Sequence, residues 1–209
     1  METIIYLIRH AQSHPSTRLH SSEWPLSAFG QIQAEKLGDL LEPLGIEVLF
    51  SSPFVRCLRT VQPFASKAGL DVVVKEDLRE RLVAKEIVKD FQEIWRRSWD
   101  DFSFALPGCE SSFDAQKRFV ASVEDIFAGY VHKTIGISTH GNVMGLFLNH
   151  IDRAFGREQA EGLRNPDVVR VVANDRLVWN REFRLPGLEN IATDNKETPA
   201  IDLTWWADP

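Results

Sequence analysis

Cysteine is scarce in this sequence of 209 residues, and an excess of positive charge is missing altogether. The two cysteines, Cys57 and Cys109, are too few for a disulfide framework, and they do not stand in a metal-ligand spacing. Lysine and arginine total 24 against 30 aspartates and glutamates, so the formal net charge of -6 leaves no basic footprint for a nucleic acid. The composition therefore predicts a reducing compartment, with neither a metal or other cofactor nor a nucleic-acid partner.

Long apolar runs are also lacking. No stretch reaches the length of a membrane span, and the apolar run at residues 4–8 is too short for a signal peptide and is followed by no small-residue cleavage site. We therefore expect a cytoplasmic protein without a membrane partner. If such an acidic chain takes an anionic substrate, it needs a local pocket of positive charge.

Alternating strand and helix patterns indicate an α/β fold. The chain is long enough for one sizeable core and short for two, so we expect a single domain over residues 1–209. The first strand pattern is apolar on both faces, as strands of a parallel or mixed sheet are. Strand patterns lie at residues 4–8, 48–50, 72–74, 135–137, 168–173 and 177–179.

Helix signals fill most of the gaps between these strands. Ser27 fits the N-cap of a helix that ends near Pro43. A second helix is expected after Ser52, and a third from Ser112 to about Tyr130.

The C-terminal part of the chain is predicted to be irregular. Residues 174–176 predict a hairpin turn between the last two strands. After Arg184 the pattern dissolves into Pro, Gly, Asn and Asp, which predicts a surface tail over about residues 185–209. Trp205 and Trp206 in that tail could pack on the same chain or on a second copy in a homodimer, and the pattern does not choose.

Three strand ends carry basic side chains. Arg9 and His10 directly follow the first strand, Arg56 opens the helix after the second, and His140 follows the fourth. Any apolar strand must end on something polar, which is the alternative explanation for Arg9 and His10 taken alone. The combination favours a phosphoryl ligand, because arginine forks and the amides of a helix starting near Gly141 bind its oxygens. A neutral imidazole can then serve as the nucleophile without a metal ion.

Four stretches resemble the motifs of the histidine phosphatase superfamily, the phosphoglycerate mutase-like proteins. They are residues 9–11 (RHA), 25–34 (PLSAFGQIQA), 51–60 (SSPFVRCLRT) and 139–142 (THGN), and their order and spacing match from residue 3 to about 183. Each motif alone is weak, and together they are strong. The resemblance implies a three-layer α/β sandwich, with helices on both faces of a central, mostly parallel, mixed sheet.

The resemblance also implies roles for individual residues. His10 matches the nucleophile that becomes phosphohistidine, while Arg9 and Arg56 match the arginines that bind phosphate oxygens. His140 matches the second pocket histidine, which we expect to be protonated when phosphate is bound; a buried core histidine is the alternative. The other residues expected to bind substrate or phosphate are Ser16, Gly141 and Asn142.

The leaving oxygen of a phosphomonoester needs a proton. Glu80, in the stretch Leu78-Arg79-Glu80, resembles the family's general acid, and we expect it to protonate the leaving group and then to activate water. Such a role is typically worth about 10² to 10⁴ in rate. The alternatives are a surface carboxylate at Glu80 and a general acid at Glu86 in the same charged run.

The segment from about residue 80 to residue 107 is expected to form a lid over the phosphate pocket, and this lid is expected to set the substrate specificity. Its aromatic residues are predicted to lie in the hydrophobic core and not to line a substrate-binding site. Residues 95–100 (WRRSWD) resemble a stretch of the phosphoglycerate mutases whose arginines bind a substrate carboxylate. Arg96 and Arg97 are therefore expected substrate-binding residues.

The function predicted by this pattern is metal-independent hydrolysis of a small anionic phosphomonoester through phosphohistidine, with inorganic phosphate as product. A mutase is one alternative, but the proline run expected after residues 95–100 and an Arg-Phe-x-Gly-Trp element after His10 are missing. A short lid also makes the exclusion of water from phosphohistidine harder. A non-catalytic phosphate-binding protein is the other alternative, and it predicts loss of His10 or of the acid, both of which are present.

Overall fold

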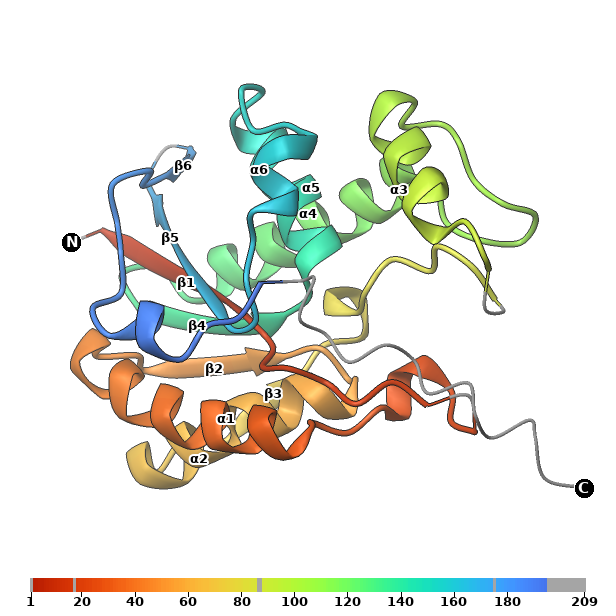
Figure 1. Ribbon diagram of the computed structural model, residues 1–209. Helices are drawn as coiled ribbons and strands as arrows, with labels where there is room; N and C mark the ends of the chain where they lie inside the picture. Colours follow the sequence, from red (N-terminus) through yellow and green to blue (C-terminus); the bar gives the residue numbers. More distant parts are fainter. Residues whose placement is uncertain (1, 17, 86–87, 175, 195–209) are drawn as a thin grey trace, which may run out of the picture.

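A six-stranded sheet runs through the centre of the molecule (Figure 1). We describe it from a computed structural model, which covers residues 2–16, 18–85, 88–174 and 176–194. The strands are β1 (Thr3–Arg9), β2 (Val48–Ser51), β3 (Val72–Val74), β4 (Thr134–Thr139), β5 (Asp167–Ala173) and β6 (Leu177–Trp179). The strand patterns of the sequence are therefore confirmed at all six places.

The strand order is β3-β2-β4-β1-β5-β6. The pairs β2–β3, β2–β4 and β1–β4 are parallel, with Ile4 of β1 opposite Thr134 and Arg9 opposite Thr139. The pairs β1–β5 and β5–β6 are antiparallel. The sheet is mixed and mostly parallel, as predicted, and β1 is enclosed between β4 and β5. Its residues alternate between two buried faces, which explains why the whole run is apolar.

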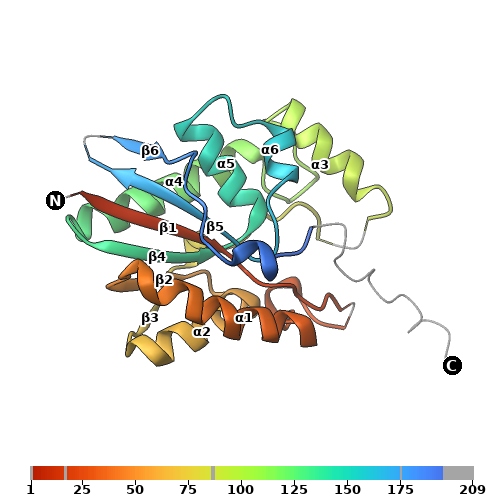
Figure 2. The same ribbon diagram turned by 60° about the vertical axis from the view of Figure 1, so that its left-hand side comes forward.

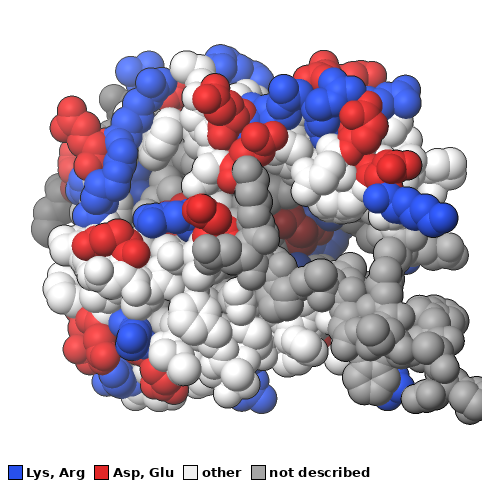
Figure 3. Space-filling view, viewed as in Figure 1, with Lys and Arg blue, Asp and Glu red and all other residues white. Residues whose placement is uncertain are grey.

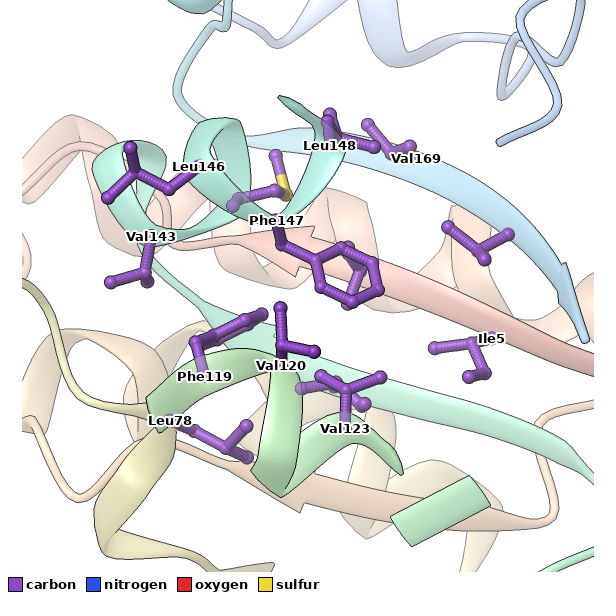
Figure 4. Close-up of a cluster of buried hydrophobic side chains, with 14 of the residues drawn as sticks. Ile5, Leu78, Phe119, Val120, Val123, Val143, Leu146, Phe147, Leu148 and Val169 are labelled. Atoms are coloured by element: carbon purple, nitrogen blue, oxygen red, sulfur yellow. The ribbon is translucent and has the colours of Figure 1, made fainter. Parts of the chain in front are cut away.

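Helices cover both faces of this sheet (Figure 2). Ile5 and Leu7 of β1 point into a core cluster built mainly from α4 and α5, part of which is drawn in Figure 4. Tyr6 and Ile8 point the other way, into a cluster shared with α1 and α2. The three-layer architecture is therefore confirmed. The helices are α1 (Ala28–Leu41), α2 (Val55–Ala68), α3 (Phe91–Asp100), α4 (Ser112–Gly129), α5 (Gly141–Ile151) and α6 (Arg157–Glu161).

Side-chain caps fix the start of two helices. The Ser27 hydroxyl accepts a hydrogen bond from the Gly30 amide at 2.9 Å, as predicted for the start of α1. The Ser111 hydroxyl caps α4 in the same way by accepting from the Asp114 amide at 3.0 Å. Short 3₁₀ turns lie at Ser21–Glu23, Glu42–Leu44, Glu76–Leu78 and Leu188–Asn190.

The prediction of a surface tail is wrong for residues 185–194. Leu185, Leu188 and Ile191 are buried and join the core cluster of α1 and α2. Their spacing of three residues suits a 3₁₀ turn, a period that the Pro, Gly, Asn and Asp around them conceal. A bridge between Asn165 and Thr193 then ties this segment to the loop before β5. Trp205 and Trp206 lie outside the described residues.

The predicted lid contains helix α3 in the part that the structure describes. Trp99 is buried, and Trp95 and Phe102 pack against the same cluster as α4 and α5, which confirms the core interpretation for these three aromatic residues. Phe91 differs, because its side chain is 45% exposed. Glu86, the alternative acid, lies outside the described residues.

The last two strands form the predicted antiparallel pair. Val171 of β5 lies opposite Trp179 of β6, and the Asn174 amide donates to the Arg176 carbonyl oxygen at 3.2 Å. Asp175 is outside the described part of the chain. Among the helices described, none is both long and apolar enough to cross a membrane.

The close approach of α1 to the loop after β1 generates a stability prediction. A Cβ atom at Gly30 would lie 2.0 Å from the carbonyl oxygen of Gln12, a backbone atom that cannot move without the loop. We expect Gly30→Ala to lower the free energy of unfolding by about 1–3 kcal/mol. Gly129→Ala is the matched control, because a Cβ at that helical glycine meets nothing within 4 Å. Urea denaturation measures both, and equal midpoints for the two variants would contradict the close approach.

Candidate active site

The carboxyl ends of β1, β4 and β2 lie side by side because these strands are parallel neighbours. Arg9 ends β1 and His10 follows it, while His140 follows β4 and caps the start of α5. Arg56 reaches the same rim from the first turn of α2. The structure thus brings together the two histidines and two arginines that the sequence placed at strand ends.

His10 is held by both ring nitrogens and is 8% exposed. Its Nδ1 lies 2.7 Å from the Ala11 carbonyl oxygen, and its Nε2 lies 3.1 Å from Arg56 Nε. Arginine Nε always carries a hydrogen, so Nε2 must accept and the ring proton must be on Nδ1, donated to Ala11. The lone pair of His10 Nε2 is therefore directed toward Arg56.

Both arginines are anchored through one end of the guanidinium group. Arg9 Nη1 donates to the Leu163 carbonyl oxygen, and Arg56 Nη1 donates to the Ser21 carbonyl oxygen, each at 2.6 Å. Burial lowers the pKa of Arg9 to about 10 and lowers that of Arg56 as well, so both stay charged at neutral pH. Arg9 Nε is buried without a hydrogen-bond partner among the described residues, which leaves a donor for an anion.

His140 is fully buried behind His10, and the two rings meet edge to face with centroids 5.3 Å apart. Its Nε2 lies 2.7 Å from the Ser52 hydroxyl and 3.3 Å from Cys57 Sγ. Burial, followed by the positive charge of Arg56, holds the pKa of both histidines well below 6.5. Burial raises the pKa of Cys57 to about 12, so this thiol carries no charge at neutral pH.

Glu80 lies at the first turn of α5. Its two carboxylate oxygens accept from the amides of Asn142 at 3.2 Å and Val143 at 3.1 Å, and Oε1 also accepts from the Arg81 amide at 2.9 Å. The positive end of α5, expected to bind phosphate, therefore faces a carboxylate here. A Cβ at Gly141 would lie 2.7 Å from Arg9 Cζ, so this glycine lets the guanidinium rest against the helix start.

A hollow of about 280 Å³ opens next to this cluster. Arg9, His10 and Arg56 line it, and Arg9 and Arg56 are the charged residues among its described lining. The remaining lining residues are Ser13, Pro15, Trp24, Phe91 and Asn165. His140, Glu80, Gly141 and Asn142 are not among these lining residues.

Arg96 and Arg97 do not reach this hollow, contrary to the expectation from the sequence. Arg96 forms ion pairs with Glu93 and with Asp100, and the Arg97 guanidinium lies 4.0 Å from the centroid of the Phe104 ring. Acidic residues three before and four after Arg96 share its face of α3, which explains its pairing. In the space-filling view, Lys and Arg over α3 and α6 are interleaved with Asp and Glu (Figure 3).

Ser16 also stays outside the lining of the hollow. Its hydroxyl accepts from the Arg18 amide at 3.2 Å, and its carbonyl oxygen accepts from Trp24 Nε1 at 2.9 Å. Ser16 therefore orients an aromatic wall of the hollow and makes no direct contribution to its floor.

Two residues that sequence analysis did not single out hold the loop that carries His10. The Asn165 amide group donates to the His10 carbonyl oxygen at 2.8 Å. Gln33, which is 1% exposed, accepts from the Gln12 amide and donates to the Asn165 and Ile191 carbonyl oxygens. Gln33 lies within a quoted motif, but its partners are far away in the sequence, so no local signal could identify them.

Groups of three or more His, Cys, Asp or Glu that could hold a metal ion were sought in the described ranges, and none is found there. The cationic groups that the structure gathers here, the guanidinium groups of Arg9 and Arg56 beside two neutral imidazoles, can bind an anion.

The fold and this site define a class: α/β proteins in which strand ends gather histidines and arginines around a place for an anion. The family model of the histidine phosphatase superfamily (branch 1) matches residues 5–176, and the chain belongs to this superfamily.

Curated relatives include both phosphatases and mutases. A probable phosphoglycerate mutase of Proteus mirabilis is 27% identical over 158 residues, which cover 70% of this chain and 74% of that protein. A putative phosphoserine phosphatase of Hydrogenobacter thermophilus is 28% identical over 154 residues, covering 67% and 74%. Among solved structures, the mycobacterial glucosyl-3-phosphoglycerate phosphatase aligns with a TM-score of 0.72 and 18% identity, over 86% of this chain and 98% of that one. This last likeness shows the fold.

The lowered histidine pKa values generate a pH prediction. The unfolded chain binds protons on His10 and His140 below pH 6.5, whereas the folded chain does not, so the free energy of unfolding falls as the pH drops from 6.5 toward 5. Each histidine contributes up to about 1.4 kcal/mol per pH unit in this window. We expect His140→Gln to reduce the slope in urea denaturation between pH 5 and 6.5. His150→Gln, at an exposed position, is the control, and equal slopes for both variants would contradict the prediction.

Proposed function

We propose that this member of the superfamily is a metal-independent phosphomonoesterase that works through a phosphohistidine at His10. One observation carries the proposal: His10 has its proton on Nδ1, anchored to a carbonyl oxygen, and directs the Nε2 lone pair toward Arg56 in a hollow that Arg9 also lines. A neutral imidazole in that arrangement is a nucleophile ready for a phosphorus atom. Fixed positive charge around it can stabilise the transition state without a metal ion.

In the first step, phosphoryl oxygens bind Arg9 and Arg56, and Arg56 Nε leaves His10 Nε2 to donate to an oxygen. His10 Nε2 attacks phosphorus, so that an N–P bond forms while the P–O bond to the alcohol breaks. The alcohol oxygen takes a proton from the Glu80 carboxyl group. The position of Glu80 at the start of α5, where Gly141 contacts Arg9, supports this assignment.

In the second step, water attacks the phosphorus of phosphohistidine and gives a proton to the Glu80 carboxylate. The N–P bond breaks, its electron pair returns to His10 Nε2, and inorganic phosphate leaves. Glu80 is then protonated again and ready for the next substrate. Glu80 thus acts first as a general acid and then as a general base, because the bond between phosphorus and the histidine nitrogen is formed in the first step and broken in the second.

The walls of the hollow support hydrolysis of a small ester over mutase activity. Arg96 and Arg97, the residues expected to bind a substrate carboxylate, are engaged by Glu93, Asp100 and Phe104. The alcohol part of the substrate would contact the side chains of Trp24 and Phe91 and those of Pro15, Ser13 and Asn165. A cytoplasmic location belongs to the proposal and is supported by two free cysteines.

The first test is hydrolysis of p-nitrophenyl phosphate in the presence of EDTA. We expect turnover by the wild type and none by His10→Ala, because the attacking lone pair is removed. A denaturing quench at alkaline pH should trap phosphate on the wild-type chain, and acid should release it, as it does from a phosphorus–nitrogen bond. His150→Ala is the control at an exposed position and should keep both properties. Turnover by His10→Ala would refute the proposal.

The second test concerns the proton donor. Glu80→Gln should lower kcat for an alkyl phosphate by about 10² to 10⁴, because a poor leaving group needs a proton. The loss in the phosphorylation step should be smaller for p-nitrophenyl phosphate, whose leaving group departs as an anion. Glu76→Gln, with a side chain that is 72% exposed, is the matched control. Equal losses in phosphoenzyme formation from the two substrates in a rapid-quench experiment would argue against Glu80 as the acid.

A further inference from the structure

His140 has an unusual set of neighbours for a histidine beside a reaction centre. The ring is fully buried and contacts the Phe54 ring edge to face at 4.9 Å. Its polar contacts among the described residues are with neutral groups: the Ser52 hydroxyl lies 2.7 Å from Nε2, and Cys57 Sγ lies 3.3 Å from Nε2 and 3.7 Å from Nδ1. No carboxylate contacts this ring among the described residues, in contrast to histidines that an acid holds protonated.

The charged groups that face His140 are cationic. Arg9 comes from the end of β1, Arg56 from α2 and Arg118 from α4, and His10 is a further group that repels a proton. Cys57 is neutral, and the Glu80 carboxylate is directed at the amides of α5. This surrounding keeps His140 uncharged at neutral pH, with one proton on one of its two nitrogens.

The hydrogen bonds around Ser52 decide which nitrogen carries that proton. The Ser52 oxygen already accepts from the Phe54 amide at 3.3 Å, and its own hydrogen has to go to an acceptor. A neutral imidazole nitrogen is a strong acceptor, whereas the sulfur of Cys57 is a weak one. The Cys57 thiol in turn donates to the Thr139 carbonyl oxygen at 3.3 Å and so is not a competing donor. The favoured arrangement has Ser52 donating to His140 Nε2.

We propose that Ser52 is a positioning residue that holds His140 in the tautomer with its proton on Nδ1, so that an uncharged His140 donates a hydrogen bond to the bound phosphoryl group. The two ring nitrogens point to opposite sides. Nε2 is bound to Ser52, whereas Nδ1 has only the long 3.7 Å contact to Cys57 Sγ among the described residues, so Nδ1 is the nitrogen that can donate to the ligand. This proposal rests on the proposed function, and it replaces the expectation of a protonated His140 in the phosphate complex.

The physical benefit is a donor that needs no proton uptake. A protonated His140 would add another positive charge to a buried group that already includes Arg9 and Arg56. A neutral N–H donor stabilises a phosphoryl oxygen without that repulsion and without a change of protonation between the two steps. The same hydroxyl that fixes the tautomer also keeps the ring from turning.

Nitrogen NMR of the whole protein tests the tautomer directly. Long-range proton–nitrogen correlation spectra of uniformly labelled protein distinguish Nδ1–H, Nε2–H and imidazolium forms of a histidine. The His140 signals are identified by their loss in His140→Gln. At neutral pH, we expect the Nδ1–H pattern both without ligand and with saturating inorganic phosphate. An Nε2–H pattern in either state, or an imidazolium pattern with phosphate bound, would overturn the proposal.

Ser52→Ala tests the role of the hydroxyl, with Ser51→Ala as the matched control. Ser51 is equally buried, and its hydroxyl donates to the Ser52 carbonyl oxygen without a contact to the ring. In Ser52→Ala we expect a mixture of the two neutral tautomers and a fall in kcat of about tenfold to a hundredfold, with a smaller change in KM. In Ser51→Ala the Nδ1–H pattern and kcat should persist.

The outcomes separate the two proposals. An unchanged Nδ1–H pattern or an unchanged kcat in Ser52→Ala would refute the role of Ser52 and leave the phosphatase intact. Absence of turnover and of a phosphoenzyme in the wild type would refute the proposed function, while the tautomer of His140 could still be read with phosphate alone.

Discussion

Four nitrogen bases enclosed in one buried rim cannot all carry charge, and this constraint shapes the site. Arg9 and Arg56 keep their protons because guanidinium is a far weaker acid than imidazolium, so His10 and His140 are the groups that lose theirs. A neutral imidazole needs one donor and one acceptor, and the fold supplies them as a carbonyl oxygen and an arginine for one ring and a hydroxyl for the other. The excess positive charge that remains is what a phosphoryl group complements.

The scaffold behind the rim is as specific as the rim itself. Gln33 lies in the core and joins three segments that are far apart in the chain: the loop after β1 at Gln12, the loop at Asn165 and the segment at Ile191. A side-chain amide has a carbonyl oxygen and two N–H groups, and here both ends are used. Segment 185–194 thus has two effects: its apolar side chains complete the core of α1 and α2, and its Ile191 carbonyl oxygen holds the Gln33 side chain that supports the loop carrying His10.

Sequence patterns predicted most of the fold and the chemical groups of the site, and the reasons for the failures are physical. Strand β1 is recognisable because it is apolar on both faces, and Arg9, His10, Arg56 and His140 are recognisable because each follows a strand end. The expected place of Arg96 at the hollow is not found, because a local motif does not reveal that Glu93 and Asp100 are on the same helix face and pair with it. Asn165 and Gln33 were missed because their partners are distant in sequence. The single-domain boundary and the homodimer stay predictions.

The site has a part that resists substitution, where Gly141 approaches Arg9, and a part that tolerates it, where Phe91 lines the hollow. At the start of α5 no side chain fits, because the guanidinium occupies the place of a Cβ. At the mouth, Phe91 is 45% exposed and can be exchanged at little cost to the core. A lineage or an engineer seeking a new substrate can therefore vary the entrance while the reacting groups are inherited unaltered, which separates the evolution of selectivity from that of the chemistry.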